Sequence, residues 1–493
     1  MKKKYIIISL LIAVLIAIGV WLFLFNKNNG GYKNGITTSY ATAASDSCNC
    51  EASWFPHEQT PPPKEGDGSP FDTKSSTNCI FHQWSWQKFL WLTKPLENGN
   101  PLFLDSLHIV TPEMAPVSPQ LGLKLVLSSI NQAGFEGVLV SNPKFVPGKK
   151  AGDTVYYSIH MNNILYDKAV LAAAQINGGK VPPTNLETFP VGSFELKVSW
   201  ITTDAIPKEK IADYFVTKAA VLNSKGKYVS KSVALLGMHV VGVVKNHPEF
   251  IWATFEHKDM APIYDLKNDN VDSATETLLY EKGKTSGLQG ITRNSSTGKP
   301  VVQSKAFVLY EYGVPKVLTT SDYMKTSQAE PANFDNVDNI NKCVASKLKD
   351  VFKNYFYNGS IWLNTDGLSP LQQAKTIVKS KISSVLPDSL ARGSSNLANI
   401  TMETYTQSFK KDIHIINAGN LVNCFTCHQS NNFDTIRKGK SPLYLSHVFE
   451  SYLYTTKPKL LQSNKNVNAK IKSIEETKVL KLKQLEEFIR ENK

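Results

Sequence analysis

Residues 233–244 read Val-Ala-Leu-Leu-Gly-Met-His-Val-Val-Gly-Val-Val, and residues 250–255 read Phe-Ile-Trp-Ala-Thr-Phe. Runs of β-branched and aromatic residues that are bounded by turn residues are typical of β-strands. Shorter runs of this kind recur between about residue 104 and residue 330, at 124–127, 137–140, 154–159, 194–200 and 306–312. Turn dipeptides such as Asn142-Pro143 separate them. This stretch of the chain therefore predicts a β-rich domain.

Helical patterns precede and interrupt the β-rich runs. Residues 81–93 are apolar on nearly every side, which is typical of a buried helix, and Pro95 ends the pattern. Two shorter helical patches are expected at residues 168–174 and 208–219. Helices mixed irregularly with strands indicate an α+β arrangement rather than regular βαβ alternation.

After about residue 335 the sequence becomes mainly helical. Residues 340–356 and 371–385 carry apolar side chains at three- and four-residue steps, and residues 468–493 form a Lys/Glu-rich amphipathic pattern. The expected fold is α+β, with a β-rich domain over residues 76–335 and a helical region over residues 336–493.

The N-terminal segment predicts a membrane anchor. Three lysines at positions 2–4 precede the uncharged residues 5–25, which span roughly 31 Å as a helix, about one bilayer core. The basic side stays in the cytoplasm, so residues 1–26 are expected to cross the bacterial inner membrane once and to leave the bulk of the chain in the periplasm. The sequence leaves open whether this segment is cleaved. Residues 27–75, rich in Gly, Ser, Thr and Pro, are expected to form a flexible linker.

The most specific chemical signal is the pentapeptide Cys424-Phe425-Thr426-Cys427-His428. C-x-x-C-H is the pattern for covalent attachment of a c-type haem. The Cys424 and Cys427 thiols add to the haem vinyl groups, and His428 becomes the proximal iron ligand. A zinc site would require a fourth ligand nearby, and the next candidate, His447, stands far along the chain. The motif therefore predicts one covalent haem c.

Several side chains are candidates for the sixth position of the iron. His447 is the only conventional ligand after the motif, Met402 and His414 precede it, and His239 stands in the apolar run 233–244. Each also has a structural interpretation, as a core methionine or a hydrogen-bonded histidine. An open position, with groups such as His239, Trp252 or His257 on the distal side, is the remaining alternative.

The other four cysteines are Cys48, Cys50, Cys79 and Cys343, an even number that suits disulfides in an oxidising compartment. A bridge between Cys48 and Cys50 would be strained, so we expect these two to pair with Cys79 or Cys343. The sequence does not determine which pairs with which.

Composition limits the classes of partner. The net charge of +13 is mild for 493 residues, and no basic run with stacking aromatics points to nucleic acid. Lysine and arginine outnumber acidic residues over residues 431–493, which favours an acidic redox partner protein, although a solvated helix face would look the same. No phosphate loop, dinucleotide fingerprint or Gly-x-Ser-x-Gly motif is present.

Several segments together resemble a known family. They are residues 84–92, 192–200, 236–241, 250–257 and 424–428. The set is similar to the large, exported, mono-haem cytochrome c family proteins of bacteria, over roughly residues 79–450. The resemblance implies a haem-binding protein that functions in electron transfer, and it implies no substrate.

Two classes of function follow from the sequence. The first is a membrane-anchored c-type cytochrome that transfers electrons in the periplasm, with a cytochrome c-like haem module in residues 336–493. The alternative is a haem-dependent oxidase or peroxidase with an open distal site under the β-rich domain. The coordination of the iron separates the two, because carriers are six-coordinate and enzymes bind exogenous ligands.

Overall fold

The structure is a computed structural model of the 493-residue chain. It describes residues 48–130, 138–182, 184–223, 225–260, 264–265, 270–271, 275–280, 282, 290–293, 300–302, 333–379, 390–394, 397, 399–402, 424–431 and 439–457. The expected anchor at residues 1–26, the expected strand at 306–312 and the amphipathic pattern at 468–493 lie outside these ranges. None of the helices within them has the length and apolar composition that a membrane span requires.

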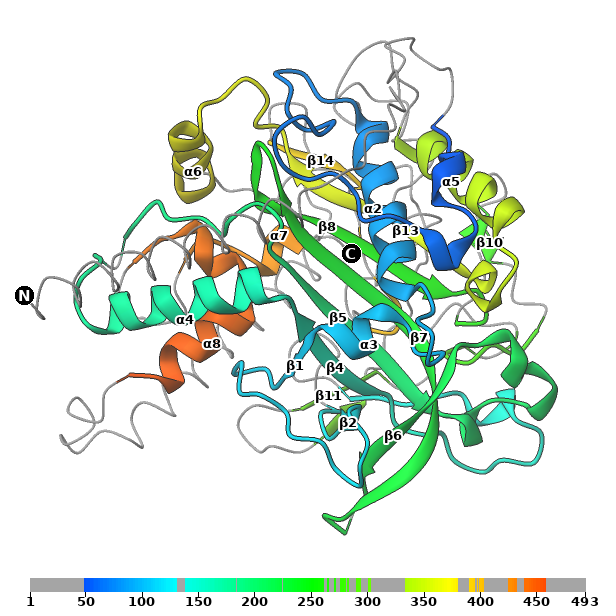
Figure 1. Cartoon of the computed structure of the whole chain (residues 1–493). Coiled ribbons are helices and arrows are strands. Elements are labelled where there is room, and N and C mark those ends of the chain that lie inside the picture. The colour runs from blue at the N-terminus through cyan, green and yellow to red at the C-terminus, as the bar shows by residue number, and fades with distance from the viewer. Residues whose placement is uncertain are drawn as a thin grey trace, which may run out of the picture. The chain divides into compact units, whose positions relative to one another are not determined.

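A nine-stranded sheet forms the centre of the described residues (Figure 1). Its strands are β1 (His108–Val110), β2 (Val126–Leu127), β4 (Tyr156–Met161), β5 (Phe194–Thr202), β6 (Val216–Leu222), β7 (Tyr228–Val244), β8 (His247–His257), β13 (Tyr355–Leu363) and β14 (Ala391–Gly393). The order is β1-β4-β5-β7-β8-β13-β14, and β6 joins β2 to β7. All pairs are antiparallel except β2 with β6. The expected α+β class is confirmed.

Strands β7 and β8 are the two apolar runs that predicted the sheet. They form a hairpin with Val244 opposite His247, and Asn246 in the turn has a φ of 63°. A two-residue hairpin turn requires positive φ, which asparagine tolerates better than most residues. The hairpin sets the register, in which Val241 lies opposite Trp252.

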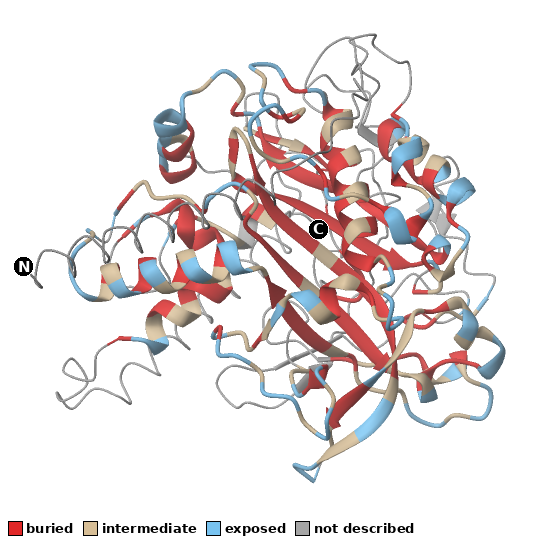
Figure 2. Ribbon diagram, viewed as in Figure 1, coloured by how far each residue is buried: buried red, intermediate tan, exposed pale blue. Residues whose placement is uncertain are grey.

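Both faces of the central strands are buried (Figure 2). One face packs against α2 (Asn78–Thr93), α3 (Leu102–Ser106) and α5 (Asn333–Lys347). The other face packs against α4 (Asn163–Asn177) and α8 (His447–Thr455), which also contact each other. On β8, Ile251 and Ala253 belong to the first cluster and Phe250 and Trp252 to the second. Burial on both faces explains why these strands are continuously apolar.

The helix expected at residues 81–93 is confirmed as α2, and the patch at 168–174 lies within α4. Residues 208–219 differ from expectation, because a 3₁₀ helix at Lys208–Asp213 leads directly into β6. Residues 371–379 lie in α6 (Pro370–Lys379), and the rest of that expected helix lies outside the described residues.

The expected division at residue 336 is not what the structure shows. Helix α5 ends at Lys347, and residues 355–363 form β13, which pairs with β8 and β14 in the same sheet. Its sequence, Tyr-Phe-Tyr-Asn-Gly-Ser-Ile-Trp-Leu, is rich in residues that favour strands. The described part of residues 336–493 is therefore continuous with the β-rich domain rather than a separate helical region.

Residues 48–77, here called the N-terminal strap, also correct an expectation, because the flexible linker was expected to extend to residue 75. The strap contains two 3₁₀ helices, η1 (Ala52–Trp54) and η2 (His57–Gln59), and it is drawn in dark blue in Figure 1. Two disulfides, Cys48–Cys79 and Cys50–Cys343, fasten it to α2 and α5. This agrees with the expectation that Cys48 and Cys50 pair with Cys79 and Cys343.

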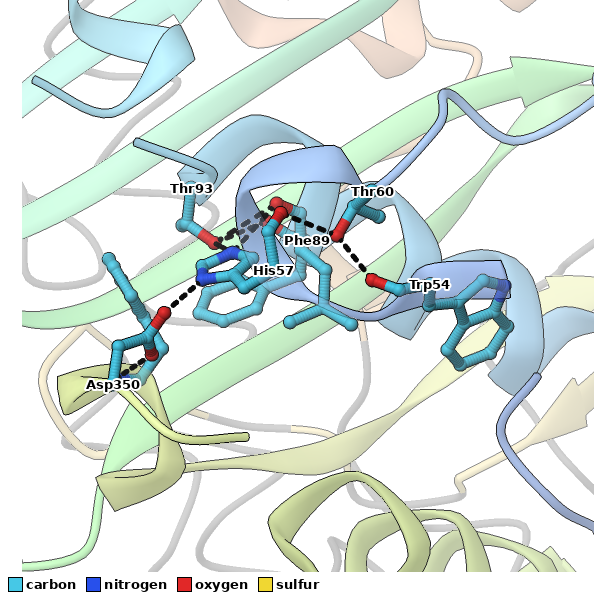
Figure 3. Close-up of polar contacts among 8 residues, drawn as sticks. Trp54, His57, Thr60, Phe89, Thr93 and Asp350 are labelled. Carbon is cyan, nitrogen blue, oxygen red and sulfur yellow. Dashed lines mark hydrogen bonds and ion pairs between the residues drawn. The ribbon is translucent and has the colours of Figure 1, made fainter. Parts of the chain in front are cut away.

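His57 is the main polar anchor of the strap (Figure 3). Its Nδ1 lies 2.5 Å from Oδ2 of Asp350, and its Nε2 lies 3.0 Å from the carbonyl oxygen of Leu90. The other oxygen of Asp350 accepts a hydrogen bond from the backbone N–H of Phe352. The His57 ring is buried, so these contacts link the strap to the end of α2 and to the segment before β13.

A buried ion pair fastens the strap further along. Glu65 Oε1 accepts hydrogen bonds from Nε1 of Trp84, at 2.8 Å, and from Nζ of Lys88, at 2.9 Å. Burial lowers the pKa of Lys88, and the charge of Glu65 opposes that shift. Removal of either partner would leave a buried charge without compensation.

We expect His57→Ala to lower the free energy of unfolding by about 3 kcal/mol, because it removes the hydrogen bonds of the ring to Oδ2 of Asp350 and to the Leu90 carbonyl and empties a buried site. Urea denaturation followed by tryptophan fluorescence measures the change. Glu58→Ala, one residue along on an exposed position, is the control and should change the stability by less than about 0.5 kcal/mol. Equal losses in the two variants would contradict this role of His57.

Candidate functional site

The Cys-x-x-Cys-His motif forms a single helical turn. Helix α7 covers Cys424–Cys427, and the backbone N–H of His428 donates to the carbonyl oxygen of Cys424 at 2.8 Å. Positions 424, 427 and 428 are separated by three and four residues, so they fall on one side of the turn. This spacing suits two thioether bonds and one axial ligand on the same porphyrin.

The turn lies against the sheet face that carries α4 and α8. Phe425 is fully buried in the same apolar cluster as Trp252, Leu443 and Phe449. Its ring centroid lies 6.3 Å from that of Trp252. The segment before α8, a 3₁₀ helix at Pro442–Leu445, also belongs to this cluster. These contacts fix the motif against apolar side chains.

His428 has a defined orientation. Its Nδ1 lies 2.8 Å from the carbonyl oxygen of Leu445, which can only accept a hydrogen bond. Nδ1 therefore carries the proton in the neutral ring, and Nε2 is the nitrogen suited to coordinate a metal. The ring also contacts Trp252, with centroids 4.2 Å apart, and His447, with centroids 3.9 Å apart.

The structure places His447, a sequence candidate for the sixth iron ligand, next to His428. The two imidazole rings are stacked on each other. Their planes are 20° apart. His447 is the first residue of α8, and Ser446 caps that helix by accepting from the backbone N–H of Phe449. The position of His447 is therefore set by the start of a helix that packs on α4.

His239 lies on the same face of the sheet as Trp252. In the register of β5, β7 and β8, Val241 is opposite Trp252, and His239 is opposite Lys197 and Thr254. Residues two apart on a strand share a face, so His239 neighbours Trp252 diagonally. Among residues 233–244, His239 is the one position that is only half-buried.

The remaining candidates for the sixth ligand or for a group on the distal side have structural roles or lie outside the described residues. His257 uses both ring nitrogens, with Nε2 at 3.0 Å from the Asp213 carbonyl oxygen and Nδ1 accepting from the backbone N–H of Asp259. Burial lowers the pKa of His257 to about 4. Met402 is buried in an apolar cluster with Met260, and His414 lies outside the described residues.

Glu195 is a residue of the site that sequence reasoning missed. It lies on β5 opposite Val241, which places it on the same sheet face as Trp252. Its Oε2 accepts a hydrogen bond from the hydroxyl of Ser446 at 2.9 Å. Burial raises the pKa of Glu195 to about 7, although the Ser446 bond opposes that shift. In the sequence, Glu195 is the one carboxylate in the predicted strand 194–200, and this could have marked it as a buried acid.

The residues present fit a covalent haem. Trp252 Nε1 is buried and has no hydrogen-bond partner among the described residues, and haem propionates accept hydrogen bonds of that kind. Four of the six cysteines form the two disulfides, and the other two are those of the motif. In the described ranges, no cluster of three or more His, Cys, Asp or Glu side chains could hold a metal ion.

Comparison of the chain with protein-family models, with curated proteins and with solved structures finds no match in any of the three.

Proposed function

We propose that this protein is a c-type cytochrome that binds one haem covalently through Cys424 and Cys427 and transfers electrons. The observation that carries the proposal is the environment of His428. It directly follows a one-turn Cys-x-x-Cys helix, and the Leu445 carbonyl holds its Nδ1 so that Nε2 is the coordinating nitrogen. The resemblance to exported mono-haem cytochrome c proteins supports the same function.

Each residue of the site has a separate task. Cys424 and Cys427 would tether the porphyrin edge, and His428 would bind the iron from the proximal side. The Leu445 carbonyl orients the imidazole, while Phe425 and Trp252 supply an apolar wall that limits the access of water. The bound haem would supply an iron centre that gains and loses one electron.

The proposal includes a location, which rests on the N-terminal segment and on the two disulfides. The apolar residues 5–25 would anchor the chain in the bacterial inner membrane, with the haem site in the periplasm. The Cys48–Cys79 and Cys50–Cys343 disulfides suit that oxidising compartment. The partner would be a redox protein with an acidic surface, because basic residues prevail over residues 431–493.

Expression of the full chain together with a c-type haem maturation system tests the proposal. We expect the denatured polypeptide to carry the mass of one haem, and the pyridine haemochrome spectrum to be that of a haem bound by two thioethers. Cys424→Ala/Cys427→Ala should lose the covalent haem completely, because no thiol remains at the motif.

Thr426→Ala is the matched control, since it alters an intervening position of the same turn and leaves both thiols and His428 in place. It should retain one haem per chain. Absence of covalent haem from the unmodified protein, or its retention in the double-alanine variant, would refute the proposed function.

A further inference from the structure

We propose that Glu195 of β5 sets the reduction potential of the haem iron. It acts as a positioning residue, because its hydrogen bond to Ser446 fixes the carbonyl group to which Nδ1 of His428 donates. This inference rests on the proposed function, since it concerns the proximal ligand of the same haem. It goes further in assigning the control of that ligand to a side chain of the central sheet, far from the motif in sequence.

A continuous chain of short contacts joins Glu195 to His428. Oε2 of Glu195 accepts from the hydroxyl of Ser446 at 2.9 Å, and the carbonyl oxygen of Leu445 lies 2.8 Å from Nδ1 of His428. That carbonyl belongs to the peptide group between Leu445 and Ser446, which is planar. The position of Ser446 therefore sets the direction of the carbonyl group. Glu195, Leu445 and Ser446 are all buried, so water competes little for these bonds.

Ser446 is the junction between two helical segments. It follows the 3₁₀ helix at Pro442–Leu445 and is the N-cap of α8, where its Oγ accepts from the backbone N–H of Phe449 at 3.2 Å. The single hydroxyl proton of Ser446 is donated to Glu195. The cap ties Ser446 to its own helix, whereas the bond to Glu195 ties it to the sheet.

The 3₁₀ helix is attached at both of its ends by a buried serine hydroxyl. Before its first residue, Ser441 donates to Oδ1 of Asn185 at 2.8 Å. After its last residue, Ser446 donates to Glu195 at 2.9 Å. The first attachment is four residues away from Leu445, and the second is adjacent to it. Glu195 is therefore the anchor that acts on the Leu445 carbonyl.

The sheet makes Glu195 a rigid anchor. It lies on a central strand, opposite Met161 of β4 and Val241 of β7. Within the described ranges, Ser446 is the one hydrogen-bond partner of its side chain. Burial of a carboxyl group costs free energy that an apolar side chain would avoid. What this group provides in return is a fixed acceptor for the junction that carries the Leu445 carbonyl.

The direction of the effect follows from the chemistry of an axial imidazole. A hydrogen bond from Nδ1 makes the imidazole a more basic ligand, which favours the oxidised iron and lowers the reduction potential. Without Glu195, Ser446 is released from the sheet and the bond between Leu445 and His428 weakens. The reduction potential should then rise.

Spectroelectrochemical titration of the haem-loaded full chain at pH 6 tests this inference. Glu195→Leu and Ser446→Ala should each raise the reduction potential. The double variant should shift it no further than the larger of the two single shifts, because both substitutions break the same chain of contacts. Glu195→Gln should keep the potential of the unmodified protein, since glutamine retains an acceptor for Ser446. Burial raises the pKa of Glu195 to about 7, so at pH 6 the acid is mostly neutral, as glutamine is.

Ser199→Ala is the matched control. Ser199 is buried on the same strand, four residues after Glu195, and its Oγ lies 2.6 Å from Oγ1 of Thr401. Its replacement removes a buried hydrogen bond of β5 that has no connection to Ser446, so it should leave the potential unchanged.

The inference would be overturned by an unchanged potential in Ser446→Ala, by additive shifts in the double variant, or by a shift in Glu195→Gln or Ser199→Ala that matches the one in Ser446→Ala. If Glu195→Leu does not fold, Ser446→Ala and Glu195→Gln still decide the question, because only the first should raise the potential. Each of these results leaves covalent haem binding intact. Absence of covalent haem from the unmodified protein would instead reject the proposed function, and this inference with it.

Discussion

Replacement of Cys50 and Cys343 by serine is expected to lower the free energy of unfolding by about 5 kcal/mol. The bridge joins residues that are 293 positions apart, and a cross-link that closes so long a loop removes much entropy from the unfolded chain. The substituted chain would also lose the attachment of the strap to α5. Denaturation by guanidinium under non-oxidising and non-reducing conditions measures the change.

The second disulfide provides an internal control. Cys48 and Cys79 are 31 positions apart, so Cys48→Ser/Cys79→Ser should cost about 4 kcal/mol, less than the long-range bridge. A reductant should destabilise the unmodified protein by more than either pair of substitutions. Equal stability of the unmodified protein and the Cys50→Ser/Cys343→Ser variant would show that this bridge does not stabilise the folded protein.

Glu195→Gln is expected to stabilise the protein by up to about 3 kcal/mol at pH 8 and to have no such effect near pH 4. Burial raises the pKa of Glu195 from 4.5 to about 7 in the folded state. The folded protein therefore holds a proton that the unfolded chain has lost between these values. The stability that this bound proton contributes is complete below pH 4.5 and is lost as the pH rises through 7. Glutamine removes this dependence and keeps an acceptor for Ser446.

The measurement is the free energy of unfolding at several pH values between 4 and 8. His160 has the opposite effect, because burial lowers its pKa from 6.5 to about 3, and its contribution is lost as the pH falls below 6.5. His257, whose pKa burial lowers to about 4, acts in the same direction as His160. Stability of the Glu195→Gln variant should therefore rise with pH from 4.5 to 6.5 more steeply than that of the unmodified protein.

Glu97→Gln, on an exposed position, is the control and should change the stability at pH 8 by less than about 0.5 kcal/mol. A loss of stability at pH 8 in the Glu195→Gln variant would mean that the carboxylate, and not the protonated acid, is the form that the folded state favours.

The strands were predictable from the sequence where both faces of the sheet are buried, because such strands are apolar at nearly every position. Residues 233–244 and 250–255 are apolar at nearly every position because both faces of β7 and β8 are covered. Helix α2 was predictable for the same reason. The end of α5 was not, because the apolar spacing of residues 340–356 continues through the point where pairing with β8 changes the chain to a strand.

The strap could not be predicted from its composition. Its glycine, serine and proline content is that of a linker, and its order depends on partners that are distant in sequence, such as Asp350 for His57 and Cys343 for Cys50. In the candidate site, the motif and the nearby His447 were visible in the sequence. The contact with Trp252, the stacking of the two imidazoles and the role of Glu195 arise only when β5, β8 and α8 come together.

The long-range disulfide imposes an order on how the chain matures. Cys50 is made early, but its partner is 293 positions later, so the native bridge cannot form until most of the chain has been synthesised. During that interval Cys50 can form a bridge with Cys79 in place of Cys48, and later with either thiol of the Cys-x-x-Cys-His motif. A folding catalyst that reshuffles premature bridges would therefore determine the yield of native protein, even though it would have no influence on the stability of the finished molecule.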